Sequence, residues 1–338
     1  MFSFDAFQEY VKENIKNYLP PEFADASVSI QVVNKNNGKQ LHGIIIRTPD
    51  NPVCPTIYLD QFYESYKEQG MDIEVVLERI AQIEVEHMNP SESFSNIVEK
   101  FQDVNFVKEN VVLTVVNAEK NAQMLLDTPH KMVEDLAIIY KLYLGRDADG
   151  IGTITVKDAH LKEWGLTVDE LHECAMENSK RLLPVMVMDM GNMLGGMLGE
   201  MGENMMPEIE EDKMMYIISN EQMVNGAASI IYSDALEKLA DKLGTDLYVL
   251  PSSIHETIAI STNYGSPEEL AQMVKEVNAT QVAMEEQLSD HVYKYDAKTK
   301  TLSLADTAVQ DLNISKVSEE NQQYEAANTE VTRPRHHR

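Results

Sequence analysis

The residues best suited to chemistry lie in the stretch LYVLPSSIHETIAI, residues 247–260, where two apolar runs flank a polar segment. That segment holds Ser252, Ser253, His255 and Glu256. A serine near a histidine could act as a nucleophile with its general base. However, residues two or three apart in a turn rarely form this contact, because the members of a triad come from separate elements. Proline and serine are also typical of a turn between strands.

A further candidate is His130, in the segment TPHKMVEDL. It follows an expected helix and precedes an expected strand, where a histidine is typical of a helix-end cap. Three interpretations stay open for these candidates: a structural turn or cap, a ligand or partner contact, and catalysis. We treat the following five residues as candidate ligand or partner contacts: Ser252, Ser253, His255, Glu256 and His130.

Several motifs of known chemistry are absent from the sequence. It contains no P-loop, no H-E-x-x-H, no C-x-x-C and no G-x-S-x-G. The segment GRDADG resembles the start of a calcium loop, but the glutamate required at the end of such a loop is missing. Cys54 and Cys174 are far apart and have no zinc-site spacing. We therefore expect no metal and no cofactor, and we assign no catalytic residue.

The elements before residue 110 follow a simple order. The N-terminal residues have apolar side chains near helical spacing, and SVSIQVV and QLHGIIIRT read as two strands joined by the turn NKNNGK. Two helices are expected next, in LDQFYESYKEQG and MDIEVVLERIAQIEVEH. The sequence thus predicts a helix–hairpin–helix region at the N-terminus.

A faint internal repeat follows, with an offset of about 100 residues. The segment VVLTVVNAEKNAQMLL is matched by MMYIISNEQMVNGAASII, DLAIIYKLYL by DLYVLP, and LTVDELHECAMEN by GSPEELAQMVKEVN. In the last pair, Thr167 and Ser266 stand three residues before Glu170 and Glu269, which is the spacing of a capping box. We predict an α+β fold in which the N-terminal region precedes two related strand-helix-strand-strand-helix modules.

Two other segments differ in composition. Between the modules, methionines recur every fourth residue among several glycines, which favours a linker or a loosely ordered helix over a stable one. A methionine-rich partner surface is the alternative. The C-terminal tail is polar and reads as disordered. The predicted division is 1–110 N-terminal region, 111–180 first module, 181–212 linker, 213–304 second module and 305–338 tail.

The charge of the chain restricts its partners. Among 338 residues, 28 lysines and arginines stand against 56 aspartates and glutamates, a formal net charge of −28. Such a surface repels nucleic-acid phosphates and anionic lipid. The sequence has no signal-peptide pattern and no apolar run of the roughly 18 residues that a membrane span needs. We expect a cytoplasmic protein with a protein partner, and the charge suits a basic one; the oligomeric state stays open.

Four segments together resemble a known family: PTIYLDQFYESYKEQG, DLAIIYKLYL, LTVDELHECAMEN and LYVLPSSIHE, in this order. The family is an uncharacterised one from anaerobic low-GC Gram-positive bacteria of the Clostridia type, catalogued as a domain of unknown function. The likeness spans most of residues 1–300. A more distant likeness is to an uncharacterised cytoplasmic family of the bacillus type. The resemblance implies no catalytic residues, and it implies genes near mobile elements.

These observations favour a non-enzymatic acidic interaction protein, associated with a mobile element on the strength of the resemblance. One alternative is an enzyme or small-molecule binder that uses a cleft between the two modules, near His255, Glu256 and His130. Another is an anti-restriction mimic of DNA, in which carboxylates imitate phosphates. Polar side chains that converge in one pocket would favour the enzyme or small-molecule binder. A continuous acidic stripe would favour the DNA mimic.

Overall fold

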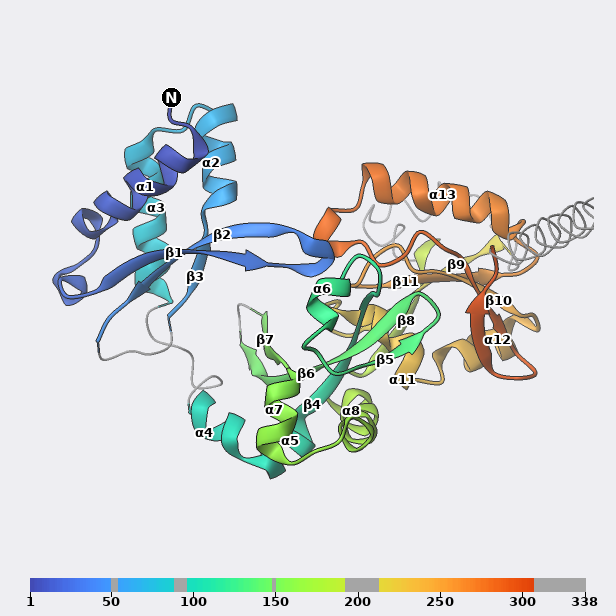
Figure 1. Ribbon diagram of the computed structural model, residues 1–338. Helices are drawn as coiled ribbons and strands as arrows, with labels where there is room; N and C mark the ends of the chain where they lie inside the picture. The colour runs from blue at the N-terminus through green and yellow to red at the C-terminus, as the bar shows by residue number, and fades with distance from the viewer. Residues whose placement is uncertain (50–53, 88–95, 148–149, 192–212, 307–338) are drawn as a thin grey trace, which may run out of the picture. The chain divides into compact units, whose positions relative to one another are not determined.

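The computed structural model describes residues 1–49, 54–87, 96–147, 150–191 and 213–306 (Figure 1). The chain divides into two compact units. The first comprises Met1–Lys131, Ala137–Leu182 and Met284–Glu286, and the second comprises Met132–Leu136, Leu183–Ala283 and Gln287–Arg338. Helices and antiparallel strand pairs occur in both units, so the predicted α+β class is confirmed.

The first unit begins with a three-stranded antiparallel sheet. Its strands β1 (Ser27–Asn34), β2 (Gln40–Arg47) and β3 (Thr56–Tyr58) pair in this order. Asn37 and Gly38, in the turn η3 (Asn36–Gly38), have φ values of 57° and 71°. Asparagine and glycine adopt this left-handed conformation most readily, which explains why the turn falls here. The predicted hairpin is confirmed.

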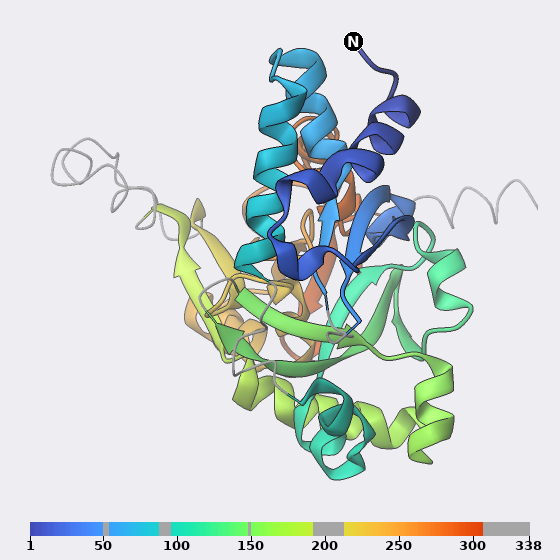
Figure 2. The same cartoon turned by 90° about the vertical axis from the view of Figure 1, so that its left-hand side faces the viewer.

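Helices α1 (Phe4–Asn14), α2 (Leu59–Glu68) and α3 (Ile73–Glu86) cover one face of this sheet (Figures 1 and 2). The sheet and helices enclose an apolar core because the buried positions recur at helical spacing on α1 and α3. The side chains at the centre of this core have at most 1 % of their surface exposed: Phe7, Val11, Ile44, Ile46, Leu77 and Ile80.

A four-stranded sheet that lies mainly in the first unit is built around a long central strand. Its strands are β4 (Val111–Asn117), β5 (His130–Val133), β6 (Leu136–Asp147) and β7 (Gly150–Thr155), in the order β4-β6-β5 with β7 also paired to β6. The accompanying helices are α4 (Ile97–Gln102), α5 (Val104–Asn110), α6 (Ala122–Leu125), α7 (Asp158–Trp164) and α8 (Val168–Leu182).

Hydrogen bonds from side chains attach α8 to β4. The Ser179 hydroxyl accepts from the amide of Leu113 (2.9 Å), and the Asn178 side chain donates to the carbonyl of Val111 (3.0 Å). The helix begins with the predicted capping box, since the Glu170 amide donates to the Thr167 hydroxyl and the Thr167 amide donates to the Glu170 carboxylate. These contacts satisfy amides that a helix start otherwise leaves unpaired.

The second unit holds a six-stranded sheet in the order β13-β12-β10-β11-β9-β8. Its strands are β8 (Val185–Asp189), β9 (Met215–Asn220), β10 (Leu247–Leu250), β11 (Thr257–Ser261), β12 (Tyr293–Asp296) and β13 (Thr301–Leu304). Its helices are α11 (Ser229–Tyr232), α12 (Ala235–Leu243) and α13 (Pro267–Thr280). At the start of α13, the Ser266 hydroxyl accepts from the Glu269 amide (3.3 Å), as the capping motif predicts.

The predicted linker, residues 181–212, contains the end of α8 and then a strand. β8 occupies residues 185–189 and pairs antiparallel with β9, so this part of the segment belongs to the sheet. Alternating valine and methionine side chains form a strand here because the sheet edge supplies hydrogen-bond partners that the local sequence does not reveal. The predicted methionine stripe (Met193, Met197, Met201 and Met205) and the tail after residue 306 lie outside the described residues.

The two predicted modules differ in their elements: the order is β4, α6, β5, β6, β7, α7 and α8 in the former, and β9, α11, α12, β10, β11 and α13 in the latter. The strands take the sheet orders β4-β6-β5 and β9-β11-β10. By position in the sheet, β6 therefore corresponds to β11, whereas the Asp-Leu pairs in the sequence match β6 with β10. Common descent of the two modules stays a prediction.

Within the described part of the chain, no helix is both long enough and apolar enough to cross a membrane.

Candidate functional site

The polar segment after β10 connects two antiparallel strands. The Ser253 hydroxyl accepts a hydrogen bond from the amide of His255 (3.0 Å), and Ser253 forms an isolated β-bridge with Gln287. The carbonyl of Ser252 accepts from the amide of Leu288 (3.1 Å). Glu256, the last residue of the segment, is half-buried. This hydrogen bonding is typical of a turn held against a neighbouring segment.

His255 also contacts the end of β9. Its carbonyl accepts from the Ser219 hydroxyl (2.7 Å), and its Nδ1 accepts from the amide of Asn225 (3.3 Å). Gly226 packs directly against both partners of the former hydrogen bond. A Cβ at this position would stand 2.1 Å from Ser219 Oγ and 2.6 Å from the carbonyl oxygen of His255, so only glycine fits without a shift. The segment therefore fixes the main chain that follows β9.

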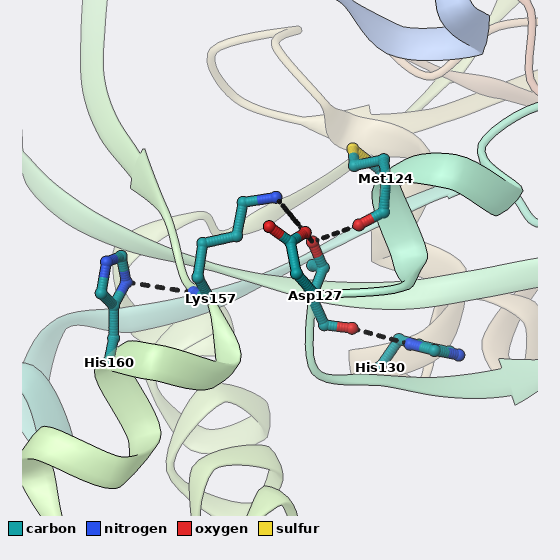
Figure 3. Close-up of polar contacts among 6 residues, drawn as sticks. Met124, Asp127, His130, Lys157 and His160 are labelled. Atoms are coloured by element: carbon teal, nitrogen blue, oxygen red, sulfur yellow. Dashed lines mark hydrogen bonds and ion pairs between the residues drawn. The ribbon is translucent and has the colours of Figure 1, made fainter.

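His130 belongs to the first unit, whereas the other four candidates belong to the second. Its Nδ1 lies 2.8 Å from the carbonyl oxygen of Thr128, so this nitrogen donates (Figure 3). The Thr128 hydroxyl in turn donates to the carbonyl of Met124 (2.7 Å) at the end of α6. The expected helix-end cap is therefore not His130 but Thr128, whose hydroxyl bonds the helix carbonyl, whereas His130 holds the chain between α6 and β5.

Lys157 joins this segment to the start of α7. Its ammonium donates to the Asp127 carboxylate (2.7 Å) and to the Thr128 hydroxyl (2.9 Å) (Figure 3). The ion pair with Lys157 lowers the pKa of Asp127 below its ordinary value. The Lys157 amide donates to His160 Nδ1 (3.0 Å), and burial lowers the pKa of His160, which keeps this nitrogen an acceptor. These contacts hold the segment between α6 and β5 against the residues that begin α7.

A tyrosine–histidine pair was not predicted from the sequence. The Tyr140 hydroxyl, on β6, lies 3.1 Å from His172 Nδ1, on α8. Burial raises the pKa of Tyr140 and lowers the pKa of His172, so this contact joins a neutral phenol and a neutral imidazole. Nothing in the local sequence could reveal the pair, because the partners are 32 residues apart and come from different elements.

Two lysines of the first unit were also missed. Lys141 on β6 is half-buried, and its pKa is lowered by burial and by the ammonium of Lys35. Lys35 precedes the η3 turn, and its Nζ stands 4.3 Å from the centre of the Tyr58 ring. Within the described residues, neither lysine side chain makes a hydrogen bond or an ion pair. For Lys141, the signal available in the sequence was a lysine inside the otherwise apolar strand DLAIIYKLYL.

Glu84 on α3 is a buried carboxylate. Its side chain is 1 % exposed, and its Oε2 has no hydrogen-bond partner in the described part of the chain. Burial raises the pKa of Glu84 to about 7. Among the described residues, no group of three or more histidine, cysteine, aspartate or glutamate side chains is arranged to hold a metal ion.

The chain belongs to a family of unknown function, DUF5688, whose model matches residues 4–297. No curated protein and no solved structure shows significant similarity to the chain. The family supplies no residue roles, so the function has to be argued from the side chains themselves.

Proposed function

We propose that this protein is a binding protein that recognises a basic protein partner through an acidic face of α3. The observation that carries the proposal is a row of carboxylates on the outer side of this helix. Glu74, Glu78 and Glu86 are exposed and follow one another at intervals of four and eight residues. Such intervals place side chains on one side of a helix.

These carboxylates have little positive charge to neutralise them. Within the described residues, Glu74 and Glu78 form no ion pair, whereas acidic residues of α8 do: Asp169 pairs with Lys131 (2.7 Å) and Glu177 with Lys180 (3.2 Å). The net charge of −28 adds a long-range field of the same sign. Uncompensated carboxylates attract cationic partners over distances longer than contact.

The pKa of Tyr18 responds to the negative charge of these carboxylates. Its pKa is raised by burial and by the carboxylates of Glu74, Glu78 and Asp72, among other groups. A negative field raises the pKa of a phenol because it disfavours the phenolate. The carboxylates therefore act together at one place on the surface.

Exposed apolar side chains accompany the carboxylates on α3. Val75 is 39 % exposed and Val85 is 42 % exposed. Val75 stands three residues before Glu78 and Val85 seven residues after it, and these intervals place both side chains near Glu78 on the helix surface. Apolar contacts beside charged ones are typical of protein interfaces, where charge steers the encounter and apolar area contributes to affinity.

The test is a pull-down from native lysate with three forms of the full chain. The first is the wild type, the second carries Glu74→Gln and Glu78→Gln, and the third is a control with Glu268→Gln and Glu276→Gln on α13. All four positions are exposed, and the control removes the same charge. We expect the α3 variant to lose a partner that the other two capture. Equal capture by all three forms would contradict the proposal.

The nature of the partner separates two versions of the proposal. If the protein mimics DNA, the captured partner binds DNA, and added duplex DNA displaces it. A basic partner that duplex DNA does not displace indicates a different interaction. The resemblance to a family whose genes are expected near mobile elements motivates this competition experiment.

A further inference from the structure

We propose that the outer edge of β1 pairs with β1 of a second copy of this chain, so that two three-stranded sheets join into one antiparallel sheet. The surface lies within the first unit and is independent of the acidic face of α3. It consists of residues 27–34, whose main chain is free on one side, which carry no charge, and whose apolar positions are symmetric.

β1 is an edge strand. The sheet order is β1-β2-β3, so one side of β1 faces β2 and the other side faces no described strand (Figure 1). All eight residues of β1 pair with β2, from Ser27 opposite Arg47 to Asn34 opposite Gln40. Among the described residues, no main-chain hydrogen bond outside this pairing reaches residues 27–34. The edge therefore presents a row of unpaired amides and carbonyls along the whole strand.

The hairpin turn indicates which of these main-chain groups point outward. The amide of Lys35 donates to the carbonyl of Lys39 (2.7 Å), so Lys35 directs its main-chain groups toward the partner strand. In an antiparallel pair, this direction alternates from one residue to the next. The odd-numbered residues of β1 thus bond β2, whereas the amides and carbonyls of Val28, Ile30 and Val32 point away from it.

The strand lacks the features that protect an edge from pairing. Its sequence, SVSIQVVN, contains no lysine, no proline and no charged residue, which are the usual means of protection. Val32 is 54 % exposed and adds apolar surface to the free edge. Because the chain has a net charge of −28, two copies approach one another with the least repulsion where each is uncharged.

The apolar positions of β1 are symmetric about Ile30. Val28 stands two residues before it and Val32 two residues after it, so the three side chains share one face of the sheet. Val28 and Ile30 contact the core on this face, whereas Val32 is left exposed. In an antiparallel pairing centred on Ile30, Val28 stands opposite Val32 of the partner subunit, which covers the exposed valine. This pairing also joins the outward-pointing main-chain groups of the same three residues.

The opposite face of the strand fits the same register. Ser29 stands opposite Gln31 of the partner subunit, so a polar side chain meets a polar one. A shift by two residues would instead place Val28 opposite Asn34 of the partner subunit and lose an apolar pair. An extended segment of another protein would satisfy the main-chain groups equally, but a surface that is complementary to itself is what a two-fold dimer requires. The geometry therefore points to a second copy.

The experiment measures the mass of the full chain by sedimentation equilibrium between about 1 and about 200 μM. Val32→Lys places an ammonium opposite an apolar side chain, and Val32→Pro removes an outward-pointing amide that β2 does not use. The control is Val98→Lys on α4, because Val98 is exposed to a similar extent, 57 %. Circular dichroism shows whether each variant is folded.

The register is tested with the double variant Ser29→Cys, Gln31→Cys. These two positions stand opposite one another across the proposed dimer, at a distance that a disulfide spans. We expect this variant to form a disulfide-linked dimer under mild oxidation, and we expect the wild type to form none.

The wild type and the Val98→Lys control should dimerise within the concentration range, and each folded Val32 variant should dimerise at least about tenfold more weakly. The proposal is overturned if the wild type stays a monomer at the highest concentration, a result that would leave the edge to a segment of another protein. It is also overturned if the folded Val32 variants dimerise as the control does, or if the double cysteine variant gives no linked dimer.

Discussion

The hydroxyl of Ser253 accepts a hydrogen bond from the main-chain amide of His255, over 3.0 Å. The same histidine accepts from the amide of Asn225 through its Nδ1. Both side chains thus hold main-chain groups of the second unit. A serine activated for nucleophilic attack would instead donate its proton to the histidine ring.

We predict that His255→Ala lowers the free energy of unfolding by about 1 kcal/mol, since one amide hydrogen bond is lost from a half-buried place. Binding of any partner should not change. Chemical denaturation measures the free energy of unfolding, and the pull-down measures partner binding. A loss of binding in a variant whose denaturation curve is unchanged would show that His255 contacts a ligand or partner.

Gly226→Ala should have a larger effect. A Cβ at this position would lie 2.1 Å from Ser219 Oγ, 2.6 Å from the carbonyl oxygen of His255 and 2.7 Å from the amide nitrogen of Asn220. Two of these atoms belong to the main chain and cannot move away cheaply, so we expect a loss of more than about 2 kcal/mol. Gly265→Ala is the matched control, because a Cβ at this position would stand 3.7 Å from Glu269 Oε2, an ordinary packing distance. Similar melting temperatures for the two variants would contradict the packing argument.

Glu84 should make the stability of the first unit depend on pH. The pKa of Glu84 is raised from 4.5 in the unfolded chain to about 7 in the folded one. The folded state therefore binds the proton more tightly, and this contribution to stability is complete below pH 4.5 and lost as the pH rises through about 7.

Glu84→Gln should consequently stabilise the protein at pH 8 by at most about 3 kcal/mol, whereas the gain should vanish near pH 4.5. Glu78→Gln is the control on the same helix, because Glu78 is exposed. Urea titrations of the three proteins across this pH range measure the difference. A constant gain at every pH would show that the carboxylate is not shielded from water.

Duplex DNA should not bind at physiological salt. With 28 basic against 56 acidic residues, the chain has few cations with which to release the counterions of DNA. A mobility-shift assay tests it, and a salt-sensitive shift with duplex DNA would be the contrary result.

Local patterns in the sequence predict the elements whose signals are local. The hairpin follows from the alternation in β1 and the Asn-Asn-Gly turn, and the start of α8 follows from the Thr167–Glu170 capping box. By contrast, β8 escapes prediction because its methionines suit a helix as well as a strand, and only pairing with β9 decides.

The candidate sites divide in the same way. The turn at residues 251–256 can be predicted, because proline and serine act on their own backbone. The burial of Lys141 and Glu84, which shifts the pKa of each, cannot be predicted from the sequence. It depends on which groups the rest of the fold brings near them. Desolvation is a property of the tertiary structure, so a polar residue in an apolar run marks such a place without revealing its partners.

The acidic face of α3 is tested most directly by the salt dependence of partner binding. The measurement is the dissociation constant of the captured partner between about 0.05 and 0.5 M sodium chloride, a range over which screening becomes strong. For the wild type and the Glu268→Gln, Glu276→Gln control, we predict that the constant rises by about tenfold or more. For the Glu74→Gln, Glu78→Gln variant, we predict weaker binding at low salt and a flatter dependence. A dissociation constant that stays the same across the salt series, or equal slopes for all three proteins, would contradict recognition through these carboxylates.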